Sequence, residues 1–337
     1  MVSYGALAYR CALSVLTSTL LLGCGAAAES AMPAVVSSSE SAVPAPQAVD
    51  PAAVGANELG LVPVLMYHQV TAHPAGEYDQ TPEEFRAELE RLHREGYCPV
   101  TAADYISGAI DIPAGTHPVV LTFDDSTVSQ LTLTADGRPE PGSAVGILEE
   151  FGAAHPDFRP TATFYVNDEA FGGDRRALAW LAEHGYDLGA HTASHANLSR
   201  LDAAGVQREL VQNLRAVAAA APGVPVRTMA LPLGVFPADR RLAAAGEWDG
   251  TPYDFAAVML VGAEPAPSPY GAIDPAGVPR IRSGRGEVPF DSAHWLDRLA
   301  QNPNLRYTSD GDPSRVSFPR GLAPEIGAAW ADRARAY

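Results

Sequence analysis

The stretch that decides the fold is PVVLTFDD, residues 118–125. Four apolar residues lead into Thr122 and Phe123, and two adjacent carboxylates, Asp124 and Asp125, follow. A continuous apolar run with a proline before it and polar residues after it is typical of a buried parallel strand. We therefore expect both carboxylates at the carboxyl end of a strand, where α/β proteins build their active sites. Taken alone, the pair could equally cap the next element.

Strand-like and helix-like stretches alternate on both sides of this run. The first expected strand, residues 61–68, ends in Tyr67 and His68, and a helix begins at Pro82 with Thr81 as its N-cap. This alternation favours a parallel α/β fold. Further strands are predicted at 99–101, 162–166, 186–189, 229–231, 255–261 and 280–282, and further helices at 102–107, 144–154, 176–184 and 202–221.

Composition narrows the class of protein. The chain has 337 residues, of which 47% are hydrophobic and 19% charged, as in ordinary globular proteins. A net charge of -17 argues against nucleic acid as a partner. Cys11 and Cys24 lie near the N-terminus, so Cys98 stands alone in the main domain and no disulfide is expected within it.

The N-terminus has the features of an export signal. Residues 1–23 combine a short basic start with an apolar run too short to span a bilayer, and they end in LLGC, residues 21–24. This tetrad resembles the bacterial lipobox, which predicts lipidation of Cys24; an ordinary signal peptide with a chance cysteine is the alternative. Residues 24–57 are rich in Ala, Ser and Pro and are predicted to form a tether. We expect an exported lipoprotein, held at the membrane in the periplasm or on the cell surface, with its folded domain at 58–337.

Two histidines four residues apart, His191 and His195, suggest a metal site. On a helical turn this spacing places both imidazoles on one face. Two histidines and one carboxylate form a common zinc-binding set that leaves a coordination position open. With nine histidines in the chain, however, such spacing also arises by chance.

Taken together, the motifs resemble a known family. The order VPVLMYH, TFDD, ATFYV, HTxxH and PxG, found between residues 61 and 282, is similar to that of the polysaccharide deacetylases, carbohydrate esterase family 4. The opening MYH looks most like the poly-N-acetylglucosamine deacetylase branch. The resemblance implies a distorted (β/α) barrel with mostly parallel strands for residues 58–337.

The resemblance also implies roles for individual residues. Asp124 would be the general base, and Asp125, His191 and His195 would hold one divalent metal ion, expected to be Zn²⁺. His68, at the end of the first strand, resembles the proton donor to the leaving amine. A backbone N–H near Leu233 would stabilise the tetrahedral oxyanion.

The sequence departs from the family at three positions. Ser126 stands where many members have glycine, and Leu233 where an aromatic residue is common. Ala230 replaces an arginine that is oriented toward the catalytic aspartate in many members, and Arg280 or Arg282 could substitute for it. A late catalytic histidine is also common, and the candidate here, His294, is interpreted as a surface residue.

Three functions remain open from the sequence. The first is a metal-dependent hydrolase that removes N-acetyl groups from a surface or extracellular polysaccharide containing N-acetylglucosamine. The second is an esterase that removes O-acetyl groups from a polysaccharide with the same site chemistry. The third is a glycan-binding protein of weak activity on the same fold. Each implies an acetylated polysaccharide as the partner.

Overall fold

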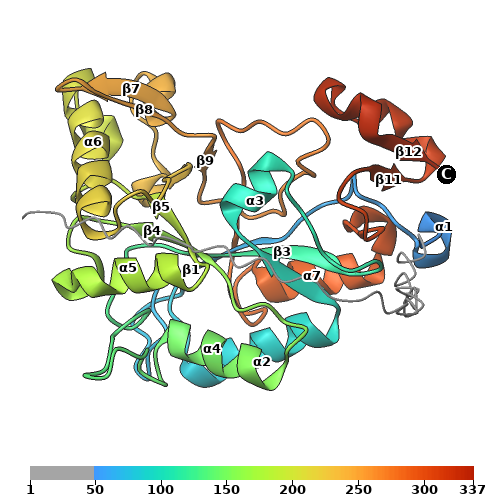
Figure 1. Ribbon diagram of the computed structural model, residues 1–337, viewed down its shortest axis with the longest axis horizontal. Helices are drawn as coiled ribbons and strands as arrows, with labels where there is room; N and C mark the ends of the chain where they lie inside the picture. The colour runs from blue at the N-terminus through green and yellow to red at the C-terminus, as the bar shows by residue number, and fades with distance from the viewer. Residues whose placement is uncertain (1–48) are drawn as a thin grey trace, which may run out of the picture. The chain divides into compact units, whose positions relative to one another are not determined.

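The structure, a computed structural model, describes residues 49–337 and is built on one parallel sheet. Its strands run in the order β10-β1-β3-β4-β5-β6-β9, and β2 pairs with the first half of β3. Every strand pair in this sheet is parallel, so the carboxyl ends of the strands share one edge (Figure 1). The strands are β1 (Val64–Tyr67), β2 (Tyr97–Val100), β3 (His117–Phe123), β4 (Thr163–Val166), β5 (Asp187–Ala190), β6 (Thr228–Ala230), β9 (Ala257–Met259) and β10 (Ile281–Arg282).

β3 forms the centre of the sheet and is buried along its whole length. Alternate residues point to opposite faces. Val119, Leu121 and Phe123 pack into the cluster that the helices cover, whereas Val120 joins the cluster on the other face. By this alternation Asp124 follows the face of Val120, which is the inner face of the curved sheet.

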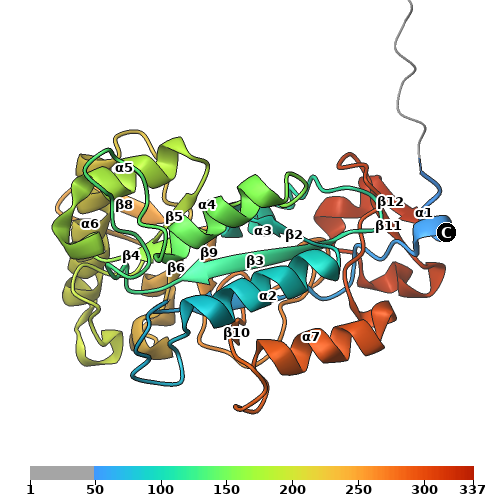
Figure 2. The ribbon, with the colours of Figure 1, turned by 90° about the horizontal axis from the view of Figure 1, so that it is seen from below.

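The helices cover the outer face of the sheet. α2 and α4 lie side by side below β3 in Figure 1, and α3 lies above it; Figure 2, the view from below, shows α2 and α4 with β3 visible between them. α2 begins with a capping box between Thr81 and Glu84, and its apolar stripe of Phe85, Leu89 and Leu92 is fully buried. The helices are α1 (Pro51–Val54), α2 (Pro82–Arg94), α3 (Ala102–Ser107), α4 (Ala144–Ala154), α5 (Arg175–Glu183), α6 (Ala203–Ala220) and α7 (Ser292–Gln301).

The predicted fold class, a distorted (β/α) barrel with mostly parallel strands, is confirmed as a half-barrel of parallel strands with helices outside. Three features were not predicted. One is the antiparallel hairpin of β7 (Ala245–Trp248) and β8 (Thr251–Asp254), whose turn residues Asp249 and Gly250 both have positive φ. The second is α7. The third is the pair of β11 (Val316–Phe318) and β12 (Ala334–Ala336) near the C-terminus.

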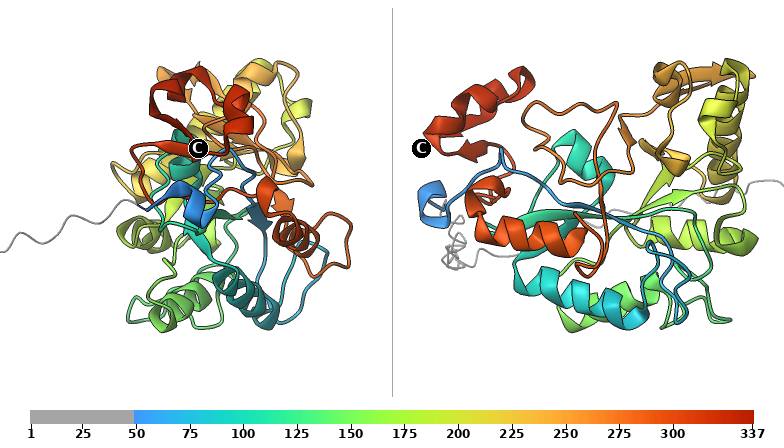
Figure 3. Two further views of the ribbon diagram at one scale, coloured as in Figure 1. Left: turned by 90° about the vertical axis from the view of Figure 1, so that its right-hand side faces the viewer. Right: turned by 180° about the vertical axis from the view of Figure 1, so that it is seen from behind.

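The folded domain begins earlier than predicted. Residues 50–57 were assigned to the tether, but α1 starts at Pro51 behind Asp50 as its N-cap, and Asn57 forms a bridge with Thr308. In both views of Figure 3 the C-terminal segment lies beside α1, and Tyr337 donates a hydrogen bond to the carbonyl of residue 56. The boundary at 57/58 was therefore wrong, because contacts with the distant C-terminal segment order this stretch.

The predicted signal peptide, Cys24 and most of the tether lie outside the described residues. Within residues 49–337, no helix combines the length and the apolar character needed to cross a membrane.

Candidate active site

Three predicted metal ligands come together at the carboxyl edge of the sheet. Asp125 follows β3, and His191 and His195 follow β5. Asp125 Oδ1 lies 3.3 Å from Nε2 of His191 and 3.3 Å from Nε2 of His195. Across the described residues this is the one group of three or more His, Cys, Asp or Glu side chains compact enough to hold a metal ion.

The histidines do not lie on a helical turn, as the spacing suggested. Residues 191–195 form a loop in which Thr192 has φ 63° and His195 has φ 53°. Asn167 Nδ2 donates hydrogen bonds to the carbonyls of His191 and Thr192, at 2.7 and 2.9 Å. Thr192 Oγ1 accepts from the N–H of Ala196 at 3.1 Å, so Thr192 also braces the loop.

The donor set fits a divalent metal ion. His191 Nδ1 donates to the carbonyl of Ala230 at 2.9 Å, which leaves Nε2 as the unprotonated nitrogen of the neutral ring. Burial and the neighbouring His191 lower the pKa of His195 and so favour its neutral form. Asp125 Oδ1 is buried and has no hydrogen-bond partner among the described residues. The lone pairs of Asp125 Oδ1 and of the imidazole nitrogens thus face one another, which is unfavourable unless a cation lies between them.

Backbone strain positions Asp125 for this role. Asp125 has φ 73° and Ser126 has φ 46°, in the left-handed region that glycine tolerates best. Ser126 stands at the position where many family members have glycine, and its conformation is compensated by local hydrogen bonds. Its Oγ accepts from the N–H of Asn167, and its carbonyl accepts from the N–H of Phe171.

Asp124 is held by a fully buried ion pair with Arg280. Arg280 Nη1 and Nη2 each donate to one carboxylate oxygen of Asp124, both at 2.7 Å. Arg280 also donates to the carbonyl of Leu260 and to Thr122 Oγ1, and its guanidinium lies over the ring of Tyr165 at 5.4 Å. Burial alone would raise the pKa of Asp124, but the Arg280 charge and hydrogen bonds hold it well below its usual range. Arg280, rather than Arg282, therefore supplies the charge that Ala230 lacks.

His68 lies on the same edge, at the end of β1. Gln130 Nε2 donates to the carbonyls of His68 and Asp124, at 2.7 and 2.5 Å, so one side chain joins the ends of β1 and β3. Its ring contacts that of Tyr78, with centroids 5.0 Å apart. Nδ1 is buried without a hydrogen-bond partner among the described residues. His68 is therefore near the site, and its role as the acid remains a prediction.

The two other candidates differ in position. Leu233 follows β6 at the same edge, with φ 58° and an exposed side chain, and its role at the oxyanion remains a prediction. His294 lies exposed on α7, where its ring contacts those of Phe290 and Trp295. The compact group of ligands does not include it.

Comparison with known proteins agrees with this geometry. Residues 111–247 match the family model of the polysaccharide deacetylases. This part of the chain is similar to the polysaccharide deacetylases. The match contains Asp124, Asp125, His191 and His195, so the resemblance inferred from the motifs is confirmed.

Individual relatives extend the comparison. A chitooligosaccharide deacetylase of Bradyrhizobium sp. (strain ANU 289) is 28% identical over 149 residues, which cover 42% of this chain and 61% of that protein. The match thus spans less than two thirds of the curated relative. Among solved structures, a polysaccharide deacetylase from Bacillus cereus has a TM-score of 0.53 at 19% identity, covering 70% of this chain and 68% of the other. Streptococcus pyogenes deacetylase PplD, solved in complex with acetate, has a TM-score of 0.52 at 18% identity, and the match covers 72% of this chain and 97% of PplD. Both structures support the fold.

Several residues around the candidate site were missed or left open by the sequence. Asn167 and Asn213 position the His191 loop; Asn213 Oδ1 accepts from the N–H of His191 at 3.3 Å. Asn167 directly follows a strand in the sequence, which is a usable signal for a site residue. Asn213 lies in the middle of α6, where its fully buried side chain gives no sequence signal. Arg280 lies beyond the region that matches the family model.

Proposed function

We propose that this chain is a metal-dependent deacetylase that removes N-acetyl groups from a surface or extracellular polysaccharide containing N-acetylglucosamine. The observation that carries the proposal is the placement of Asp125, His191 and His195 beside the Arg280-bound Asp124 at one edge of the sheet. One divalent ion, Zn²⁺, suits two imidazoles and one carboxylate. The deacetylase match over 111–247 supports the reaction class.

The chain's own residues divide the work of amide hydrolysis. When bound, the metal ion would supply Lewis acidity, which lowers the pKa of water toward ~7 and polarises the acetyl carbonyl. Asp124, kept ionised by Arg280, accepts the proton of the attacking water. His68 donates a proton to the nitrogen of the leaving amine. The backbone at Leu233 lies at the same edge and offers an N–H to the developing oxyanion.

The test is an acetate-release assay on a panel of acetylated polymers. N-acetylglucosamine oligomers, poly-N-acetylglucosamine and acetylxylan are each supplied before and after treatment with a chelator. The proposal expects acetate from an N-acetylated polymer, loss of release on chelation and recovery with Zn²⁺. Release from acetylxylan alone would indicate the O-acetyl esterase, and binding without release from any polymer would indicate the glycan-binding alternative.

We further infer that the chain is exported and lipid-anchored through Cys24. The support is the LLGC tetrad at 21–24 behind a short apolar run. Replacing Cys24 by Ser should move the protein from the membrane fraction to the aqueous fraction of cell extracts. If wild type and the Cys24→Ser variant both partition into the aqueous fraction, the anchor does not exist.

A further inference from the structure

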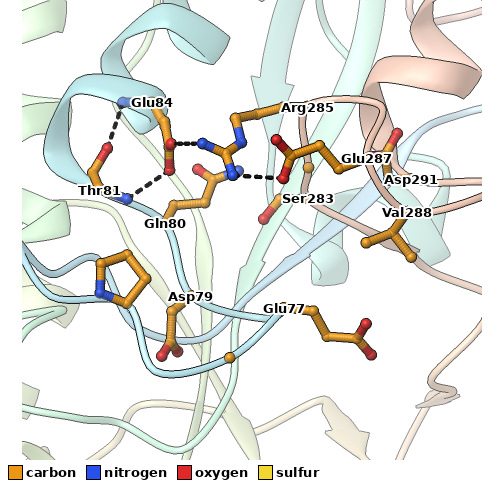
Figure 4. Close-up of a pocket in the computed structure, with 13 residues that line it drawn as sticks. Glu77, Asp79, Gln80, Thr81, Glu84, Ser283, Arg285, Glu287, Val288 and Asp291 are labelled. Atoms are coloured by element: carbon orange, nitrogen blue, oxygen red, sulfur yellow. Dashed lines mark hydrogen bonds and ion pairs between the residues drawn. The ribbon is translucent and has the colours of Figure 1, made fainter.

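An acidic pocket of about 330 Å³ opens beside the catalytic edge (Figure 4). Its walls come from two segments, the loop that leads from β1 into the first turn of α2 and the loop that leads from β10 to α7. The volume is at the lower end of the range for small-ligand sites. The pocket is lined by Pro74, Gly76, Glu77, Asp79, Gln80, Thr81, Glu84, Ser283, Gly284, Arg285, Glu287, Val288 and Asp291.

The pocket adjoins the proposed catalytic residues along the sheet. β10, β1 and β3 are successive neighbours, and the N–H of Ser283 donates to the carbonyl of Met66 at 3.0 Å. Two strand spacings, roughly 10 Å, therefore separate the start of the pocket from the end of β3. Tyr78 links the two regions, because its ring contacts His68 on one side and lies under the Arg282 guanidinium, at 5.1 Å, on the other.

The pocket carries unbalanced negative charge. Its lining has five carboxylates and one guanidinium, that of Arg285, which pairs with Glu84 and Glu287. Arg282 pairs with Glu77 from outside the lining at 2.7 Å. The other two carboxylates form no salt bridge with any cation of residues 49–337; they belong to Asp79 and Asp291.

Two buried polar groups in the lining also have no partner. The Ser283 side chain is 2% exposed and its Oγ makes no hydrogen bond with any described residue; in Figure 4 this hydroxyl points into the pocket. Gln80 is 4% exposed, and its Oε1 is likewise unpaired. A buried polar group without a partner is costly, so both groups indicate a ligand that supplies hydrogen bonds.

The spacing of the carboxylates decides what kind of cation fits. No three acidic ligand atoms of this pocket lie close enough together to share one metal ion. A cationic group on a larger polar molecule can instead contact carboxylates on separate walls. A sugar ring with a protonated amino group has this size, polarity and charge, and the proposed reaction produces such a ring.

We propose that the acidic pocket is a subsite for a glucosamine unit with a free amino group, next to the N-acetylated unit that is hydrolysed. The inference rests on the proposed function, since it assumes that one polymer chain occupies both the catalytic site and the acidic pocket. Charge-assisted hydrogen bonds from the ammonium group to Asp79 and the neighbouring carboxylates would hold the unit. The enzyme would therefore act faster on a chain that is already partly deacetylated.

The direct test measures binding of glucosamine tetramers, of β-1,4 and β-1,6 linkage, to the metal-loaded protein by calorimetry at low salt. We expect one of the two to bind and the affinity to fall with added salt. Asp79→Asn should weaken binding about three- to tenfold. The matched control is Asp254→Asn, an exposed aspartate on β8 without an ion pair, which should bind as wild type. Ser283→Ala should weaken binding without lowering the melting temperature.

Absence of tetramer binding, or equal binding by Asp79→Asn and wild type, would overturn the subsite. Binding of Ca²⁺ alone, lost in Asp79→Asn, together with no binding of either tetramer, would overturn it in favour of a cation site. A second measurement compares kcat/KM for a fully acetylated tetramer and one with a single glucosamine, and a preference for the mixed tetramer is expected. If no acetate is released at all, the proposed function fails while the calorimetry still decides the pocket.

Discussion

Two carboxylates are buried to the same extent at opposite edges of the sheet. Asp124 is 2% exposed at the carboxyl edge, and Glu58 is 3% exposed ahead of β1 at the amino edge. Glu58 accepts hydrogen bonds from neutral donors, the N–H groups of Ser317 and Asp310 and the hydroxyl of Tyr307 among them. Burial raises the pKa of Glu58 to about 7 in spite of these bonds. The pKa of Asp124 is lowered instead.

The difference is the guanidinium of Arg280. Neutral donors offset only part of the cost of burying a charge, whereas a bidentate cation with its own hydrogen bonds outweighs that cost. The edge that carries the proposed chemistry thus keeps its base ionised. At the opposite edge, where the C-terminal segment contacts residues 56–58, the carboxyl of Glu58 is protonated over part of the physiological pH range.

The largest expected effect follows from removing Arg280. Arg280→Met leaves Asp124 buried without a counter-charge and should lower the free energy of unfolding by about 3–5 kcal/mol. Turnover should fall with it, because burial then raises the pKa of the base. Urea denaturation measures the first effect and acetate release the second.

Two further variants sharpen this result. Arg86→Met breaks an exposed pair with Glu150 and should cost no more than about 1 kcal/mol. Combining Arg280→Met with Asp124→Leu should restore much of the lost stability, since neither charge is then left alone. If the free energy of unfolding of Arg280→Met lies within about 1 kcal/mol of the wild-type value, Arg280 does not offset the cost of burying the Asp124 charge.

The next largest effect is the pH dependence that Glu58 imposes. In the unfolded chain this carboxyl ionises near its ordinary pKa of 4.5, but in the folded protein near 7. Its contribution to stability is complete below pH 4.5 and is lost as the pH rises to 7, by up to about 3 kcal/mol. Glu58→Gln should flatten the curve of unfolding free energy across this window. Parallel curves for the variant and wild type would show that Glu58 is ionised throughout.

The smallest of the three effects concerns His68. If it donates the proton to the leaving amine, His68→Gln should lower turnover about 10²-fold while metal content stays at the wild-type value. His294→Gln is the control and should be nearly neutral, because His294 is exposed on α7. A large loss of turnover in His294→Gln, with near-normal turnover in His68→Gln, would assign the role of the acid to His294 instead.

The sequence was sufficient to predict the position of the site residues that directly follow strands. Asp124, Asp125 and the first histidine of the pair each end an apolar run, and parallel strands bring such positions to one edge whatever lies between them. Their convergence was therefore predictable from local patterns. The Asp249-Gly250 turn of the missed hairpin was also readable, since this dipeptide favours a two-residue hairpin loop.

Other features depend on contacts that no local pattern encodes. Arg280 lies 156 residues from Asp124, so the sequence allowed either Arg280 or Arg282 as the partner. The conformation of residues 191–195 could not be read from the spacing of the histidines, because hydrogen bonds from Asn167 and the positive φ of Thr192 hold a loop in place of a helical turn. Residues 50–57 looked like a tether because their partners, such as Thr308, come at the other end of the chain.

The central claim is that two neighbouring carboxylates have separate tasks, Asp125 in holding the metal ion and Asp124 in accepting the proton. The most direct measurement is metal stoichiometry together with acetate release for Asp124→Asn and Asp125→Asn, both loaded with Zn²⁺ and compared where both are folded. We expect Asp124→Asn to keep about one metal ion per chain and to lose turnover by 10²-fold or more, and Asp125→Asn to lose both. Full metal binding by Asp125→Asn, or normal turnover by Asp124→Asn, would contradict the account.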